Sequence, residues 1–261
     1  MNATNQRDAA RARLEQQMAE RKSAARRKRR VLTGVAAGAA VVVVGGATAW
    51  VIHIATRPVP AECDYQALPA EAVTPTVKDV GKPPAEVPKS GMKTMTLSTN
   101  FGDVDIVMDR ALAPCTVASF THLASKNFFN DTKCHRMFPG MLQCGDPSAK
   151  GPGYRQTDGT GGPNYVFGTE NLPLNKRPAY PAGTVAMART QDPVSNGSQF
   201  FIITQDNENL SPDYTVFGTM SAAGQEIIKK ATATGHDGAF EPTPGGGHPK
   251  KDIILKSVAV R

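Results

Sequence analysis

The stretch Asn196-Gly197-Ser198-Gln199-Phe200-Phe201-Ile202-Ile203-Thr204 predicts a buried strand that is entered from a turn. Asn-Gly is a strong turn dipeptide, and the β-branched and aromatic run after it is typical of strands. Because side chains alternate across a strand, Gln199 and Phe201 face one side while Phe200 and Ile202 face the other. Both sides therefore carry a large apolar group, and we expect one to fill a core and the other to line a surface pocket.

Two further blocks accompany this stretch. The first is Cys134-His135-Arg136-Met137-Phe138-Pro139-Gly140-Met141-Leu142-Gln143-Cys144-Gly145-Asp146, followed by glycines at 159, 161 and 162, and the second is Tyr214-Thr215-Val216-Phe217-Gly218. In this order the three blocks resemble the signature of the cyclophilins, the barrel-shaped peptidyl-prolyl isomerases. The resemblance covers about residues 92–261 and fits a bacterial, membrane-anchored member of that family.

The folded domain is expected to begin near Met92. Alternation of apolar and polar residues on both sides of Asn100-Phe101-Gly102 predicts a β-hairpin. Helices are predicted over 116–125 and 225–231, and a closing strand over 252–260. Many short strands with two helices indicate a mainly-β protein with a closed antiparallel barrel. The resemblance implies eight strands capped by the two helices.

The charge of the chain is unevenly distributed. The net charge of +7 arises entirely within residues 1–30, so the remaining chain is neutral. Binding to a nucleic-acid duplex depends largely on neutralising phosphates. We therefore predict no nucleic-acid partner for the body of the protein, although the basic run at 26–30 leaves a nuclear or nucleic-acid role as a competing interpretation.

Residues 31–55 contain no formally charged side chain. A helix of this length spans roughly 37 Å at about 1.5 Å per residue, enough to cross a hydrocarbon core of about 30 Å with tilt. The basic cluster at 26–30 precedes this segment and Trp50 lies near its far end, which predicts a single transmembrane helix with a cytoplasmic N-terminus. A cleavable signal peptide, ending at the A-x-A-like sequence Ala47-Thr48-Ala49, is the alternative.

These features divide the chain into four parts. Residues 1–30 are a basic cytoplasmic tail, 31–55 the transmembrane helix, 56–91 a linker rich in Pro and Ala, and 92–261 the isomerase domain. The linker, which has no periodic apolar face, is expected to be extended and to hold the domain away from the membrane on its extracytoplasmic side.

Rotation about an X-Pro bond requires loss of amide resonance but no nucleophile and no proton transfer. An apolar pocket that fixes the proline ring, and a fixed donor aimed at the prolyl nitrogen, are sufficient. Arg136 is the candidate catalytic residue, since a guanidinium is always charged and donates well. The alternative is an ordinary surface arginine. The substrate-binding residues that we expect are Met141, Leu142, Gln143, Ala188, Arg189, Gln199, Phe201, Leu210 and Tyr214.

Within this set, Phe201 with Met141 or Leu142 would form the pocket floor, and Leu210 its edge. Gln143 and Gln199 would hold substrate carbonyls, and the resemblance places Ala188 and Arg189 where the substrate backbone binds. The chain departs from the family pattern in having one residue fewer before Gln143. It also carries Asn209 in place of a frequent Trp and Tyr214 in place of a usual His.

The chain has four cysteines, at 63, 115, 134 and 144. Cys134 and Cys144 flank the Pro139-Gly140 turn almost symmetrically, so a cross-strand disulfide between them is plausible, which leaves Cys63 with Cys115. Free thiols are the alternative. The histidines at 236 and 248 lie in Gly/Pro-rich loops without a metal-ligand spacing, so we predict no metal site and no cofactor.

The sequence thus predicts a membrane-anchored cyclophilin-type isomerase that acts on proline-containing polypeptides during extracytoplasmic protein folding. The alternative is a proline-binding chaperone or scaffold module with weak turnover. The altered pocket residues favour that alternative, whereas Arg136, Gln199 and Phe201 favour the enzyme.

Overall fold

The computed structural model describes residues 60–242 and 245–261. The predicted basic tail at 1–30 and the predicted transmembrane helix at 31–55 lie outside these residues. Within the described ranges, no helix is both long enough and apolar enough to cross a membrane.

The hairpin predicted at the start of the domain is present. Strands β5 (Met92–Thr99) and β6 (Gly102–Asp109) pair antiparallel, with Thr99 opposite Gly102. Gly102 has a φ of 128°, which favours glycine at the end of the tight loop. Met95, Leu97, Val104 and Ile106 are buried, as alternation across a strand requires when one face meets a core.

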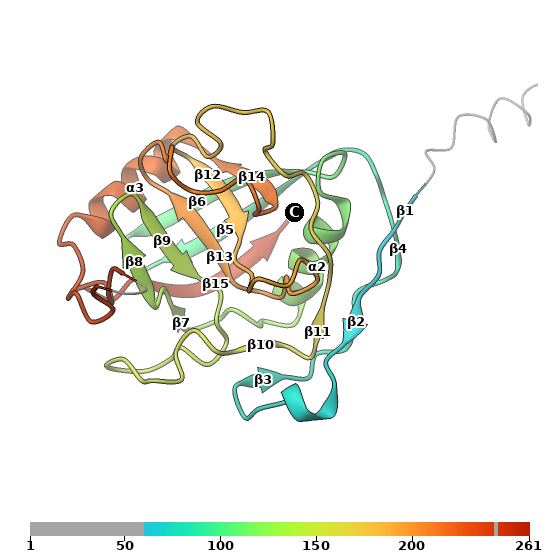
Figure 1. Ribbon diagram of the computed structural model, residues 1–261, viewed down its shortest axis with the longest axis horizontal. Helices are drawn as coiled ribbons and strands as arrows, with labels where there is room; N and C mark the ends of the chain where they lie inside the picture. Colours follow the sequence, from blue (N-terminus) through green and yellow to red (C-terminus); the bar gives the residue numbers. More distant parts are fainter. Residues whose placement is uncertain (1–59, 243–244) are drawn as a thin grey trace, which may run out of the picture. The chain divides into compact units, whose positions relative to one another are not determined.

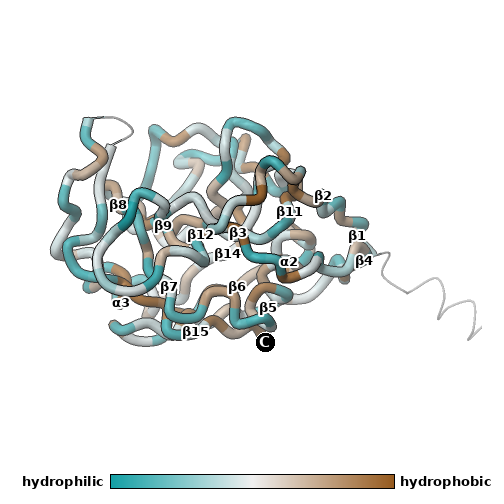
Figure 2. The backbone as a smooth tube through the Cα atoms, turned by 90° about the horizontal axis from the view of Figure 1, so that it is seen from below, coloured by the Kyte–Doolittle hydropathy of each residue, from teal (hydrophilic) through white to brown (hydrophobic). Residues whose placement is uncertain are grey.

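The central sheet has nine strands in the order β7-β15-β5-β6-β14-β12-β13-β9-β8 (Figure 1). Its other members are β7 (Thr132–Lys133), β8 (Arg136–Phe138), β9 (Met141–Cys144), β12 (Thr184–Met187), β13 (Phe200–Ile203), β14 (Val216–Met220) and β15 (Ile254–Val260). Hydrophobic stretches recur along these strands, and the connecting loops are more hydrophilic (Figure 2).

The prediction of a closed eight-stranded barrel was wrong in strand number and in closure, because the sheet curls without a ladder between its edge strands β7 and β8. Residues in and next to β8 make isolated contacts with the segment that leads into β15. Cys134 N–H donates to Ile253 O at 2.9 Å, and Met137 forms an isolated bridge with Gly247. Isolated hydrogen bonds therefore bridge the gap between the two edges, which no ladder closes.

Two α-helices pack on this sheet within the described residues. Helix α2 (Pro114–Ser125) begins with a proline, whose missing N–H is harmless in the first turn, and contacts β15 and β6. Helix α3 (Ala222–Thr232) is capped by the Ser221 hydroxyl, which accepts from Gly224 N–H, and it contacts β6 and β14. Both predicted helices are confirmed, each with an earlier start.

Buried side chains form two separate clusters. The main core lies between the sheet and α2, where Phe120 stacks on Phe129 and Phe217. The second cluster is smaller and consists of Ala179, Tyr180, Ala186, Phe201 and Ile203. Strand β13 contributes to both, since Phe200 and Ile202 enter the main core while Phe201 and Ile203 enter the second cluster. The two-faced strand predicted from the sequence is thus confirmed.

Residues 60–91, which we call the strap, do not form the expected extended linker. The strap contains β1 (Ala61–Glu62), β2 (Gln66–Ala67), the 3₁₀ helix η1 (Ala70–Ala72), β3 (Val77–Lys78) and β4 (Glu86–Val87). A disulfide joins Cys63 to Cys115 of α2, and Tyr65 and Val87 are buried in the main core. In Figure 1 the strap follows one side of the domain, past β11 (Tyr165–Val166) and β10 (Gly162–Pro163).

Candidate functional site

The second cluster provides an apolar floor at the surface. Phe201 is only 4% exposed and lies edge-on to the Tyr214 ring, with their centroids 5.3 Å apart. Partly buried Met141, Leu210 and Ala188 pack around it. The structure therefore brings together most of the residues that we predicted for a proline pocket.

Leu142 is the exception. It is completely buried in the main core, because β9 turns alternate residues to opposite faces and Met141 takes the pocket side. The prediction that either residue could line the floor is therefore resolved in favour of Met141, and Leu142 does not belong to the site.

Arg136 begins β8 and lies directly opposite Gln143 of β9. Its side chain is half-buried, and its guanidinium carbon lies 4.0 Å from the centroid of the Phe138 ring and 5.6 Å from that of Phe240. Nη2 donates to Gly245 O at 3.2 Å. Burial lowers the pKa of Arg136 from its usual value, but a guanidinium remains charged at neutral pH. The two rings and the carbonyl hold the charge in one place.

Gln143 lies between Arg136 and the apolar floor, because it is opposite Phe201 on β13 and opposite Arg136 on β8. Its Nε2 donates to Gln199 Oε1 at 2.9 Å. An amide nitrogen carries two hydrogens, so Gln143 can donate the second to a substrate carbonyl. That Gln143 holds a substrate carbonyl stays a prediction.

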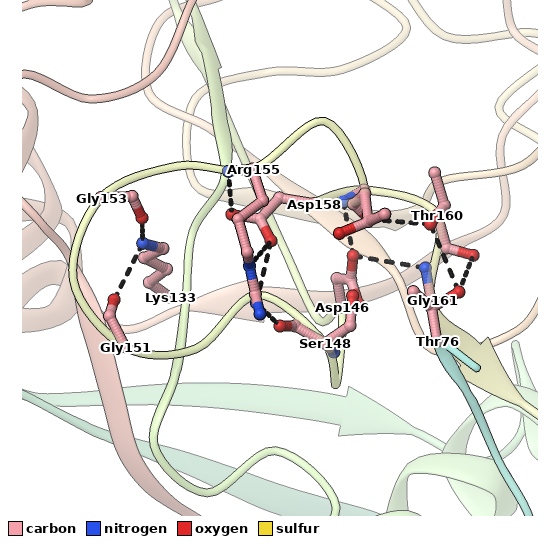
Figure 3. Close-up of polar contacts among 12 residues, drawn as sticks. Thr76, Lys133, Asp146, Ser148, Gly151, Gly153, Arg155, Asp158, Thr160 and Gly161 are labelled. Carbon is pink, nitrogen blue, oxygen red and sulfur yellow. Dashed lines mark hydrogen bonds and ion pairs between the residues drawn. The ribbon is translucent and has the colours of Figure 1, made fainter.

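Gln199 has a different role from the one expected. Its Nε2 donates to Gly159 O at 2.8 Å and to Gly161 O at 2.9 Å, so both amide hydrogens are used within the protein. Buried Asp146 fixes these glycines by accepting from the backbone N–H groups of both, and Figure 3 shows its contact with Gly161. Gln199 is thereby oriented to hold Gln143, which makes it a positioning residue.

Ala188 and Arg189 follow β12 at the edge of the apolar floor. Ala188 N–H donates to Gln199 O at 2.9 Å, which keeps this segment beside β13. The Arg189 side chain turns toward the protein, where Nε donates to Asp213 O at 2.7 Å and the guanidinium lies 5.5 Å from the Tyr214 ring centroid. Both residues thus lie at the edge of the apolar floor, and their contact with a substrate backbone stays a prediction.

Tyr180 is a site residue that the sequence did not reveal. It is fully buried beneath Phe201, and its hydroxyl accepts from Tyr214 N–H at 3.0 Å and donates to Ser211 O at 3.0 Å. Burial raises the pKa of Tyr180 to about 12, so the hydroxyl stays protonated at neutral pH. Tyr180 lies in a loop rich in Gly, Pro and Asn, where no periodic pattern marks a buried residue.

Both predicted disulfides are present, between Cys134 and Cys144 and between Cys63 and Cys115. Cys134 and Cys144 flank the Arg136–Gln143 pair, and their Cα atoms lie 4.0 Å apart. Neighbouring His135 is 3% exposed, and neither ring nitrogen has a hydrogen-bond partner among the described residues. Burial lowers the pKa of His135 to about 4, so the ring is neutral at pH 7.

The chemistry available at this site is limited and specific. Within residues 60–242 and 245–261, no group of three or more His, Cys, Asp or Glu side chains is placed to hold a metal ion. The site combines a fixed guanidinium, a glutamine donor and an apolar floor. Such an arrangement can bind a peptide through a proline ring and stabilise charge on a nitrogen next to it.

Comparison with known proteins agrees with this geometry. The family model for "Cyclophilin type peptidyl-prolyl cis-trans isomerase/CLD" matches residues 94–260. The chain is 37% identical over 208 residues to the probable peptidyl-prolyl cis-trans isomerase B of Mycobacterium leprae, covering 70% of this chain and 64% of that protein. It is 33% identical over 184 residues to the peptidyl-prolyl cis-trans isomerase B of Streptomyces anulatus, covering 63% and 94%.

A crystal structure of a Cryptosporidium parvum cyclophilin-type isomerase superposes with a TM-score of 0.55 at 24% identity, covering 66% of this chain and 98% of that one. At this identity the likeness concerns the fold. The chain spans just under two thirds of the length of the Mycobacterium leprae relative.

Proposed function

Because this chain belongs to the cyclophilin-type peptidyl-prolyl isomerase family, we propose that it accelerates cis–trans rotation of X-Pro bonds in polypeptides. One observation carries the proposal. Arg136 is held by Phe138, Phe240 and Gly245 on the strand next to β9, whose Gln143 lies opposite Phe201. A fixed positive donor therefore accompanies a pocket that suits a proline ring.

The residues fit the physical demands of the reaction. The uncatalysed barrier is about 18–20 kcal/mol because the twisted bond has lost amide resonance. Its prolyl nitrogen then carries a localised lone pair, which the Arg136 guanidinium can stabilise by donating a hydrogen bond. Phe201 and Met141 hold the ring while Gln143 holds a flanking carbonyl, so that one side of the bond is fixed as the other rotates.

The test is a peptide isomerisation assay on the full chain, comparing Arg136→Ala with wild type. Removing a preorganised donor of this kind costs about 100- to 1,000-fold in kcat. Arg136→Lys keeps the charge but loses the planar fork, and we expect it to recover little. Arg110→Ala, which removes an arginine from the end of β6 and its contact with Ser90 O, is the matched control.

Circular dichroism and thermal unfolding establish that each variant is folded. Turnover of folded Arg136→Ala within about twofold of wild type would contradict the catalytic role. Wild-type protein that binds proline peptides without accelerating their isomerisation would instead favour a proline-binding chaperone or scaffold module.

We also propose that the enzyme belongs to a bacterial cell and is membrane-anchored through residues 31–55, with its domain in an extracytoplasmic compartment where it assists folding. The absence of formal charge in this segment and the basic cluster before it support this orientation. Two disulfides and no free cysteine among the described residues suit an oxidising compartment. Protease added to intact cells should release the domain, and protection of the domain would contradict this orientation.

A further inference from the structure

The strap borders a cavity beside the proposed proline pocket. The cavity has a volume of about 370 Å³, in the range of small ligand sites. Its inner side includes Gln143, Ala188 and Gln199, and its outer side includes Leu68, Ala72 and Val77 of the strap. Ala188 also packs against the apolar floor around Phe201, so the two pockets share a wall.

Several independent contacts fix the strap in this position. Strand β3 pairs in parallel with β10, with Val77 opposite Gly162, and β2 pairs with β11. Leu68 N–H donates to Asn164 O at 3.0 Å. The Thr160 hydroxyl donates to the Thr76 hydroxyl, and Figure 3 shows Thr76 beside Thr160 and Gly161. The outer wall is therefore a built part of the domain.

A glycine permits this close approach. A Cβ atom at Gly161 would lie 2.9 Å from Thr76 O, closer than real Cβ contacts allow. Gly161 is the residue whose carbonyl accepts from Gln199. The strap thus contacts the same loop that orients Gln199 and, through Gln199, the Gln143 side chain.

The cavity wall that the strap contributes is apolar. Leu68, Ala72 and Val77 face a side that also includes Pro163 and Val166. Arg189 is the charged residue lining the cavity, and its guanidinium donates to the carbonyls of Asp213, Thr190 and Gln191. These hydrogen bonds use the Nε and Nη1 donors of Arg189, so those donors are not available to an acidic side chain. The cavity also has polar lining residues, including Thr160 and Ser195, and the strap supplies the apolar wall that suits an apolar side chain.

We propose that the strap is a specificity-determining wall, which selects peptides with an apolar side chain of leucine or phenylalanine size within about two residues of the proline. An extended peptide advances about 3.3 Å per residue, so a side chain near a proline on Phe201 reaches past Ala188. The family model begins at residue 94, so this wall comes from a part of the chain outside the matched domain. The inference rests on the proposed isomerase function.

The experiment uses the full chain and peptides in which Ala, Leu, Phe or Glu occupies each of the two positions before and after the proline. Both kcat/KM for isomerisation and peptide affinity by fluorescence anisotropy are measured. Ala72→Trp fills the cavity from an exposed position on η1. Val73→Trp is the matched control, because Val73 is 52% exposed and is not among the residues lining the cavity.

At one of the four positions, we expect kcat/KM of the wild type to be about tenfold higher with Leu or Phe than with Ala. This is the size of effect that extra methylene groups have in an apolar pocket. Ala72→Trp should abolish this preference, whereas Val73→Trp should retain both the preference and the wild-type turnover of the alanine peptide.

Equal selectivity in wild type and Ala72→Trp, or a preference for Glu, would overturn the inference while isomerisation itself remained intact. It is also possible to observe no isomerisation while peptide affinity still depends on side-chain size and changes in Ala72→Trp. That result would support the inference about the strap and contradict the proposed catalytic function. If neither isomerisation nor binding is found, both fail.

Discussion

Tyr180→Phe tests whether the floor of the site depends on a hydroxyl beneath it. The substitution removes the Tyr180 hydroxyl, which accepts a hydrogen bond from Tyr214 N–H and donates one to Ser211 O, each at 3.0 Å. A net contribution of about 0.5–1.5 kcal/mol per hydrogen bond predicts a loss of about 1–3 kcal/mol in the free energy of unfolding. The phenylalanine ring itself fits the same space, so the core should not collapse.

The catalytic consequence follows from Tyr214, whose ring lies edge-on to Phe201. An aromatic pair of this kind contributes about 0.5–1.5 kcal/mol, so loosening it should raise KM by up to about tenfold. No hydrogen bond joins Tyr180 to Arg136 in the described structure, and kcat should therefore remain within about twofold of wild type.

Peptide isomerisation at several substrate concentrations separates kcat from KM, and denaturant unfolding gives the change in stability. Tyr65→Phe is the control, because it also removes a hydroxyl, the donor to Cys115 O at 2.7 Å, but from the strap end of the main core. It should lower stability and leave KM unchanged. A Tyr180→Phe enzyme with normal KM and reduced kcat would refute the reasoning.

Three other predictions concern stability and inhibition. The pKa of His135 is lowered to about 4, so the unfolded chain binds more protons between pH 6.5 and 4. Stability should therefore fall on acidification by about 1.4 kcal/mol per pH unit, and His135→Leu should flatten this slope in denaturant titrations. Removing the disulfide with Cys63→Ser and Cys115→Ser, 52 residues apart, should cost about 4 kcal/mol in a chain-entropy estimate without reducing kcat for short peptides; unchanged stability would show that the strap holds without it. Asn209→Trp should tighten cyclosporin inhibition about 100-fold, as the resemblance implies, while turnover changes little; nanomolar inhibition of wild type would contradict this.

Local sequence patterns predicted the parts of the fold that depend on strand alternation and turn residues. The alternation around Gly102 predicted β5 and β6, and the turn at Pro139-Gly140 predicted β8 and β9. The strap could not be predicted in this way, because its strands are two residues long and two of them, β2 and β3, pair with residues 162–166. Its composition resembled a linker, and only tertiary contacts show that Tyr65 and Val87 are core residues.

The site residues also differ in how well local sequence predicts them. Arg136, Gln143 and Phe201 were predicted because their strands carry recognisable motifs, and the structure places the three in register. Met141 and Leu142 are adjacent apolar residues, so the sequence does not show which of them faces the core. The pairing of β9 with its neighbouring strands places Leu142 in the main core. The roles of Tyr180 and Gly245 depend on loops folded back over long sequence distances.

The position of the strap at the start of the described domain has a consequence for the order in which the chain acquires structure. A ribosome delivers residues 60–91 before their partners outside the strap, which include Cys115 and residues 162–166. Pairings between such distant residues form late, since a long loop must close before they contribute. Apart from β1 and β4, which pair with each other, the strap therefore lacks its pairing partners until most of the sheet has been synthesised. We expect nascent chains truncated before residue 162 to expose it to protease, and completed chains to protect it.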